Sequence, residues 1–150
     1  MARDLVGKVL RRRYADNWLS VSIVETEAYY LWDKGSHASL GRTPSREALF
    51  MAPATIYMYF ARGGDSLNFS TQGAGNAVLI KSGAPFIDDD ESVLEQMHDL
   101  NPAPSGRRPD NRLCSGQTLL CRALNLKVQA WDRKWLCRDT FFIEDVGYRP

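Results

Sequence analysis

The sequence is poor in the side chains that usually hold metals or form disulfides. Its 150 residues include three cysteines and two histidines. Cys114, Cys121 and Cys137 are odd in number and lack a C-x-x-C spacing, which argues against a disulfide framework and against a zinc site. Two histidines are too few for a histidine-rich metal centre, and neither His37 nor His98 lies in an H-E-x-x-H or G-x-S-x-G context. We therefore expect reduced cysteines and no bound metal.

Long apolar runs and nucleotide-binding motifs are also missing. No apolar run approaches the roughly 20 residues of a membrane-spanning helix, so we expect no membrane contact. The basic start, "MARDLVGKVLRRR", lacks the apolar stretch and the cleavage site of a secretory signal. Without a Walker motif or a G-x-G-x-x-G stretch, a nucleotide cofactor has no support, and we expect no cofactor. The remaining chemistry is acid–base chemistry by side chains.

The composition is typical of one soluble globular domain, with 44% hydrophobic and 25% charged residues. The formal net charge is only +1, but the basic residues form islands at 11–13, 42–46, 107–112 and 133–138, and an acidic run occupies 88–91. Such islands could contact phosphates even in a nearly neutral chain, although an ordinary solvated surface is the alternative.

Hydrophobic periodicity and turn residues predict both strands and helices. Strands are predicted over 17–29, 54–60, 77–83 and 139–150, and a short helix leading into a strand over 3–13. Helices are predicted over 88–100 and, within 113–126, for about nine residues after Ser115, where first-turn amides could hold an anion. Residues 61–76 have loop or hairpin chemistry, and the turn-rich stretch 30–48 predicts a functional loop.

One predicted strand contains a feature that needs a reason. An apolar face with Val21 and Ile23 runs directly into Glu25, Glu27 and Tyr29. Placing a carboxylate beside an apolar core costs several kcal/mol unless the group is hydrogen-bonded, paired or protonated. Two interpretations stay open: the glutamates pair with local arginines, or a carboxylate activates water to cleave an already activated bond.

Five stretches of the sequence carry a resemblance to a known family. The stretches "IVETEAYY", "SHAS", "FMAPATIYMYF", "LNFSTQGAGNAVLI" and "RLCSGQTLLCRAL" occur in the order of the motifs of the alkyladenine (3-methyladenine) DNA glycosylase family, and the resemblance covers nearly the whole chain. It implies one mixed α/β (α+β) domain over residues 1–150, built around a curved, mainly antiparallel β-sheet with flanking helices. It also implies a C-terminal family segment beyond "VGYRP" that this chain does not include.

Enzymes of that family flip a damaged nucleotide out of the DNA duplex and hydrolyse its N-glycosidic bond. The resemblance therefore implies a monofunctional DNA glycosylase that removes alkylated purines of the 3-methyladenine type and starts base excision repair. The implied partner is double-stranded DNA containing alkylated purines. We expect a monomer, cytoplasmic and nucleoid-associated if the source is bacterial, and nuclear if it is eukaryotic.

The resemblance also implies roles for residues of the base pocket. Glu27 matches the water-activating residue, which must be ionised to act as a base. Tyr29 and Tyr59 match aromatic walls that stack on the flipped base, His37 lines the pocket opposite, and Asn68 discriminates against the guanine amino group. Each also has an ordinary interpretation: core packing for the tyrosines, plain surface for His37 and a turn residue for Asn68.

Other residues are implied as DNA contacts or as support. Arg62 stands where the family usually has a turn whose tyrosine fills the space left by the base, and a guanidinium can also stack there. Lys81 replaces the common arginine, as a phosphate contact or a partner of a glutamate, with Schiff-base chemistry as the weaker alternative. Ser115 and Gly116 belong to the intact "LCSG" motif. Glu25 is left as a supporting carboxylate paired with an arginine.

Two other functions stay open at this stage. A non-catalytic DNA-damage recognition module could keep the pocket without turnover. A two-carboxylate glycosidase acting on soluble sugars could use Glu25 and Glu27, which lie roughly 7 Å apart along a strand. Salt dependence of binding separates the DNA functions from the sugar function, because phosphate contacts release counterions and neutral sugars do not.

Overall fold

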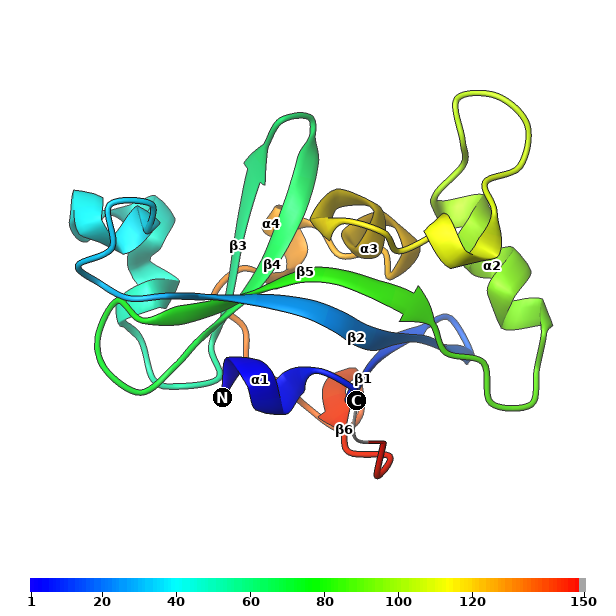
Figure 1. Cartoon of the computed structure of the whole chain (residues 1–150), viewed down its shortest axis with the longest axis horizontal. Helices are drawn as coiled ribbons and strands as arrows, with labels where there is room; N and C mark the ends of the chain where they lie inside the picture. The colour runs from blue at the N-terminus through cyan, green and yellow to red at the C-terminus, as the bar shows by residue number, and fades with distance from the viewer. Residues whose placement is uncertain (149–150) are drawn as a thin grey trace.

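The chain folds around a curled antiparallel β-sheet, drawn in Figure 1 from a computed structural model that describes residues 1–148. Six strands are hydrogen-bonded in the order β3-β4-β5-β2-β1-β6, and each neighbouring pair is antiparallel. The strands are β1 (Val9–Tyr14), β2 (Asn17–Tyr29), β3 (Ile56–Ala61), β4 (Gly64–Ser70), β5 (Ala77–Pro85) and β6 (Phe141–Glu144). The expected fold class, a mixed α/β domain around a curved antiparallel sheet, is confirmed.

The two edge strands of the sheet are connected by the segment that precedes β6. Thr55, next to β3, forms an isolated bridge with Trp135, and Cys137 forms another with Phe141 at the start of β6. Inside the curl, the ring of Phe69 on β4 lies 6.3 Å from that of Phe141. The sheet is therefore curled into a half-barrel around its apolar face.

Short helices cover the sheet on both sides. In Figure 1, α2 and α3 lie above the long β2–β5 pair, and α1 and β6 lie below it. The α-helices are α1 (Ala2–Leu5), α2 (Ser92–Leu100), α3 (Gln117–Ala123) and α4 (Val128–Trp131), and the 3-10 helices are η1 (His37–Leu40), η2 (Pro44–Phe50) and η3 (Asp110–Arg112). Leu120 of α3 and Leu124, which follows it, are fully buried in the same core cluster as Val21 and Ile23 of β2. This packing places the start of α3 beside the β3–β4 hairpin.

The strand over 17–29 is confirmed with the predicted bounds, and the strands predicted over 54–60 and 77–83 correspond to β3 and β5. The helices over 88–100 and 113–126 correspond to α2 and α3, and the last predicted strand is β6, although residues 149–150 of its range lie outside the described part. Of the two alternatives for residues 61–76, loop or hairpin, the structure has the hairpin, because these residues include the turn after β3 and strand β4, every residue of which is buried.

The polarity of β4 explains why its sequence does not read as a strand. Asp65 accepts a hydrogen bond of 3.0 Å from the backbone N–H of Val128. Ser70 donates a bond of 2.8 Å to the carbonyl of Ala52. A buried polar group needs such partners, and these lie far away along the chain. The local sequence therefore predicted a loop or a hairpin without placing a strand here, whereas tertiary contacts make it a buried strand.

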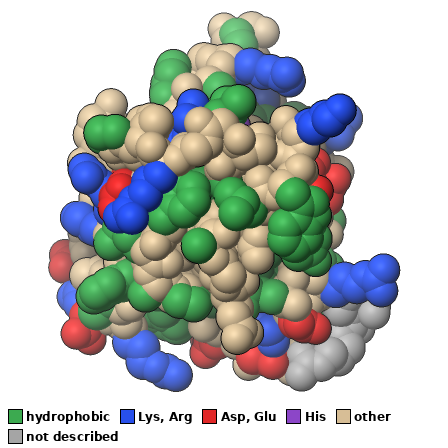
Figure 2. All heavy atoms as spheres, turned by 90° about the vertical axis from the view of Figure 1, so that its left-hand side faces the viewer, with side chains coloured by type: hydrophobic (Ala, Val, Ile, Leu, Met, Phe, Trp, Pro, Cys, Tyr) green, Lys and Arg blue, Asp and Glu red, His purple; other side chains and the backbone are tan. Residues whose placement is uncertain are grey.

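Much of the basic surface is paired with carboxylates. Arg11 forms ion pairs with Asp88 and Glu144, and Arg107 forms one with Glu95. Figure 2 shows the end of the molecule at the left of Figure 1, where hydrophobic side chains lie in the middle and lysine and arginine side chains form separate groups around them. The islands at 11–13 and 107–112 are thus partly neutralised within the fold.

No helix within residues 1–148 is long and apolar enough to cross a membrane.

Candidate active site

Strand β2 changes character at a β-bulge between its apolar and acidic halves. The pairing with β5 shifts register between Ile23 and Glu25 and again between Glu25 and Thr26. Bulges re-aim side chains and are common beside active sites. Glu25 is exposed, and its side chain forms no hydrogen bond or ion pair with any residue in 1–148, so the expected arginine partner is absent there. Beyond the bulge, Glu27 and Tyr29 are half-buried and line a groove.

The carboxylate of Glu27 has two polar partners. The hydroxyl of Tyr29 donates a hydrogen bond of 2.6 Å to Oε2, and Lys81 Nζ lies 3.1 Å from Oε1. The Tyr29 hydrogen bond lowers the pKa of Glu27 most, desolvation acts against it, and Lys81 lowers the pKa further. The same bond raises the pKa of Tyr29 to about 12. At neutral pH, Glu27 is therefore an ionised carboxylate and Tyr29 a neutral hydrogen-bond donor.

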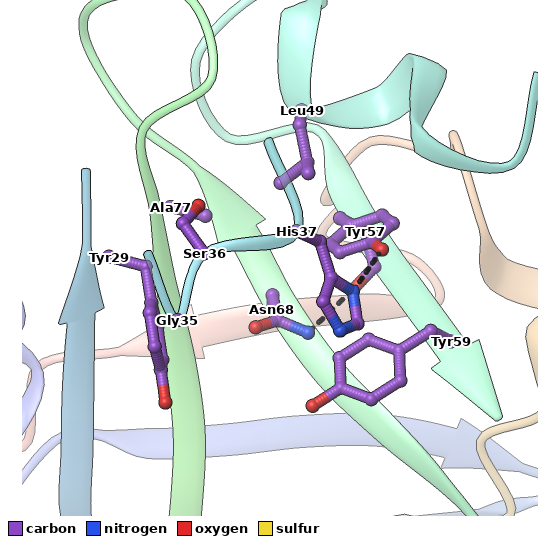
Figure 3. A pocket seen from close by; sticks show the side chains of 9 residues that line it. All are labelled: Tyr29, Gly35, Ser36, His37, Leu49, Tyr57, Tyr59, Asn68 and Ala77. Atoms are coloured by element: carbon purple, nitrogen blue, oxygen red, sulfur yellow. Dashed lines mark hydrogen bonds between the residues drawn. The ribbon is translucent and has the colours of Figure 1, made fainter. Parts of the chain in front are cut away.

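Beside this carboxylate, aromatic rings surround a small pocket. In Figure 3, Tyr29 stands on one side, His37 and Tyr59 stand on the other, and Asn68 lies at the back between them. The lining residues are Tyr29, Gly35, Ser36, His37, Leu49, Tyr57, Tyr59, Asn68 and Ala77. Facing aromatic side chains separated by a gap are an arrangement that can receive a flat ring.

His37 is held in the pocket wall as a neutral ring. It is the first residue of η1, whose N-cap, Ser36, accepts a hydrogen bond from the N–H of Ala38. Its Nδ1 shares a hydrogen bond of 2.8 Å with the Tyr57 hydroxyl, and its ring centroid lies 4.4 Å from that of Tyr59. Burial, with a smaller contribution from Arg46, lowers the pKa of His37.

Asn68 is a buried β4 residue whose amide is fixed by the backbone. Its Nδ2 donates a hydrogen bond of 3.2 Å to the carbonyl of Tyr57 on the neighbouring strand. The plane of the carboxamide is therefore set by the sheet. Asn68 occupies a strand and not the turn that its local sequence allowed.

The aromatic pocket is a recess of a larger groove. The groove has a volume of about 490 Å³, against about 50 Å³ for the pocket, and the two share Tyr29, His37 and Tyr59. The remaining predicted residues that line the groove are Glu27, Arg62, Lys81, Ser115 and Gly116. The structure thus brings every predicted site residue to the pocket or the groove, although this placement alone does not test their roles.

Arg62 occupies the tip of the β3–β4 hairpin. Ala61 pairs with Gly64, so Arg62 and Gly63 form a two-residue turn. Both have positive φ, 52° at Arg62 and 79° at Gly63, as a type I′ turn requires. Such a φ is unfavourable for an arginine, and this strained turn places an exposed guanidinium at the end of the hairpin.

The helix after the "LCSG" motif begins differently from the expectation. Its N-cap is Gly116, with φ of 105°, and no side chain caps the helix. Ser115 lies one residue earlier, because the positive φ needed at the turn suits glycine and not serine.

Two contributors to the site escaped sequence reasoning. Tyr57 was missed although strand alternation places it on the same face as Tyr59. Gln117 was missed because its partners, Ser66 and the Tyr59 hydroxyl, come from the distant hairpin.

Within residues 1–148, no cluster of three or more His, Cys, Asp or Glu side chains is arranged to hold a metal ion.

Known proteins that are similar to this chain in sequence are named as DNA glycosylases. Residues 1–150 match the sequence model of a family described as methylpurine-DNA glycosylase. A Pseudomonas aeruginosa (strain UCBPP-PA14) protein named "Putative 3-methyladenine DNA glycosylase" is 58% identical over 153 residues, covering 100% of this chain and 64% of that protein. The DNA-3-methyladenine glycosylase of Mus musculus is 39% identical over 144 residues, covering 93% of this chain and 43% of the mouse protein. The chain therefore spans just under two thirds of the length of that bacterial relative.

Proposed function

The chain belongs to the methylpurine-DNA glycosylase family, and on this premise we propose that it removes alkylated purines from double-stranded DNA by hydrolysing the N-glycosidic bond. The observation that carries the proposal is the carboxylate of Glu27 beside an aromatic pocket, with the Tyr29 hydroxyl 2.6 Å from Oε2. The names of the relatives support 3-methyladenine as one substrate. The reaction starts base excision repair.

Glu27 acts on the water that replaces the base. An alkylated purine carries a positive charge, so the bond electrons move to the base as it leaves and positive charge develops on the sugar. Water then adds to C1′ while the Glu27 carboxylate accepts its proton, which leaves a free base and an abasic site. The carboxylate also stabilises the developing positive charge of the sugar. The lowered pKa of Glu27 keeps it in the basic form that this step needs.

The aromatic pocket binds the flipped base. Tyr29 stacks on one face of the base, and His37 with Tyr59 covers the other, which favours an electron-poor alkylated purine. The carboxamide of Asn68, fixed by its bond to Tyr57, stands at the base edge and discriminates against the guanine amino group.

Residues around the groove hold the DNA. Lys81, Ser115 and Gly116 contact the phosphates of the damaged strand, and Lys81 also holds Glu27 in place. Arg62, at the exposed hairpin tip, enters the space that the flipped base leaves. The chain works in the cytoplasm on nucleoid DNA if its source is bacterial, and as a monomer.

The test is single-turnover base release from methylated duplex DNA by the unaltered chain and by Glu27→Gln. We expect the substitution to slow release by about 10²- to 10⁴-fold, the usual contribution of a general base, while binding to a duplex with a non-hydrolysable lesion analogue changes little. Glu25→Gln is the matched control. Glu25 is exposed and its side chain has no partner within residues 1–148, so its substitution should leave the release rate unchanged.

Each other outcome has a distinct meaning. Tight, lesion-selective binding without release by the unaltered chain would favour a non-catalytic recognition module. Release that persists in Glu27→Gln would remove Glu27 from the role of base. If the unaltered chain neither binds the duplex nor releases the base, the proposed activity is refuted for this chain.

A further inference from the structure

Helix α3 contacts the β3–β4 hairpin at successive levels. At the tip, Arg122 Nη2 donates a hydrogen bond of 3.2 Å to the carbonyl of Gly63. Lower down, Gly64 packs so closely on Thr118 that a β-carbon at this glycine would overlap the threonine side chain. The helix thus supports the strained turn that carries Arg62.

The third contact reaches the wall of the base pocket. Gln117 Nε2 donates a hydrogen bond of 2.8 Å to Ser66 Oγ on β4, and lies 3.4 Å from the Tyr59 hydroxyl on β3. Gln117 is the first residue of α3 and follows Gly116 of the groove. One short helix therefore touches the hairpin tip, its second strand and the aromatic wall.

The contact of Arg122 is unusual for a charged residue. Its guanidinium has no carboxylate partner within residues 1–148, and the turn carbonyl is its one hydrogen-bond acceptor there. A hydrogen bond from a charged donor is about twice as strong as a neutral one. The tip of the hairpin needs such support because β3 is an edge strand and β4 pairs with β5 only from Asn68 to Ser70, so that the part nearer the tip is two-stranded, and two-stranded hairpins are only marginally stable alone.

We propose that α3 is a brace that pre-organises the hairpin for base flipping, with Arg122 and Gln117 as positioning residues. The inference rests on the proposed function and deepens it. Flipping requires the free energy of unpairing and unstacking a base, and a hairpin already held in its inserting conformation loses little further entropy on entering the duplex. Arg122 thereby positions the Arg62 wedge, and Gln117 positions the Tyr59 wall.

The first test needs no catalytic activity. Amide hydrogen exchange of the free protein is compared between the unaltered chain and Arg122→Ala. We expect the amides of residues 60–65 to exchange about tenfold faster in the variant, the effect of losing one charge-assisted hydrogen bond, while those of β2 and β5 keep their rates. Arg3→Ala, which removes an exposed arginine on α1, is the charge-matched control. Unchanged exchange at the hairpin, or equal acceleration throughout the sheet, would overturn the inference.

The second test separates flipping from bond cleavage. Single-turnover base release is measured for a methylated purine in a fully paired duplex and for the same lesion opposite an abasic site. Opposite an abasic site the lesion has no pairing partner, so flipping is easier. Arg122→Ala should slow release from the paired duplex about tenfold and leave release from the unpaired lesion within about twofold. Gln117→Ala should act on both substrates, because it loosens the pocket wall.

If Arg122→Ala slows base release equally on both substrates, or on neither, a positioning role of Arg122 in flipping is contradicted. If the unaltered chain releases no base from either duplex, the proposed function fails. The hydrogen-exchange result then still decides whether α3 braces the hairpin.

Discussion

Among the individual residues of the site, Tyr29 has two tasks that involve different parts of its side chain. Its ring forms one wall of the pocket, and its hydroxyl donates to the carboxylate of Glu27. The hydrogen bond is the largest cause of the lowered pKa of Glu27, ahead of Lys81. Because this pKa is lowered in the folded protein, the bond stabilises the fold above the ordinary glutamate range. This stabilisation is lost as the pH falls through the lowered pKa.

Substitution of the Tyr29 hydroxyl should therefore change the pH dependence of base release. A base is active when deprotonated, so release by the unaltered chain should persist below the ordinary glutamate pKa and fall only at lower pH. Tyr29→Phe removes the main cause of the lowering, and the acid limb of the rate should move to higher pH. Tyr59→Phe, which removes a pocket hydroxyl that does not bond to Glu27, should leave the position of the limb unchanged. Single-turnover rates between pH 3 and pH 7 test this shift.

At the scale of secondary-structure elements, the β3–β4 hairpin combines strain with exposure. The φ of 52° at Arg62 belongs to a type I′ turn, where asparagine before glycine is favoured. An arginine at this position is unfavourable for the turn but places a long cation at its tip. Local stability is thus lower than the turn geometry permits, which is the cost that the proposed wedge role of Arg62 implies.

Arg62→Asn should separate stability from function. We expect it to stabilise the fold by roughly 0.5–1 kcal/mol, because asparagine tolerates the left-handed conformation, and to raise the melting temperature by about 1–4 °C. The same change should slow base release from a paired duplex, because the wedge is lost. Thermal unfolding and single-turnover release measure the two effects, with Arg3→Asn as the control. An unchanged or lower melting temperature would show that the turn stores no strain.

At the scale of the whole molecule, the net charge is too small to attract DNA by itself. The formal net charge is +1, and several basic islands are occupied by internal ion pairs. In our proposal, DNA affinity therefore comes from a few local contacts around the groove and not from the overall field. Lys81 is one such contact in our proposal, and its side chain remains 38% exposed although it is paired with Glu27.

Lys81→Met should lower the salt dependence of DNA binding. Each neutralised phosphate contributes about 0.9 to the slope of log K against log salt concentration for duplex DNA, so the slope should decrease by about that amount. Arg3→Ala on α1 should leave the slope unchanged. Binding titrations between 50 and 200 mM salt measure the slope, and an unchanged slope for Lys81→Met would remove Lys81 from the phosphate contacts.

Much of this architecture could be predicted from local patterns. The alternation of β2 and the apolar spacing of α2 and α3 act over a few residues, which is why these elements agree with their predictions. The family resemblance also pointed to several residues that line the pocket or the groove, but not to Tyr57 or Gln117. Glu27 could be distinguished from Glu25 as the water-activating candidate only through the family resemblance, because simple strand alternation places both glutamates on one face.

The sequence alone determined the hydrophobic periodicity of the main strands and helices and the residue types available to the site. Through the family resemblance it also determined the fold class. Only the tertiary structure decided that the bulge directs Glu25 away from the groove, that polar β4 is a buried strand, and that α3 braces the hairpin. The physical reason is the range of the interactions. Periodicity depends on near neighbours, whereas the bond of Gln117 to Ser66 joins residues 51 positions apart and exists only once the chain has folded.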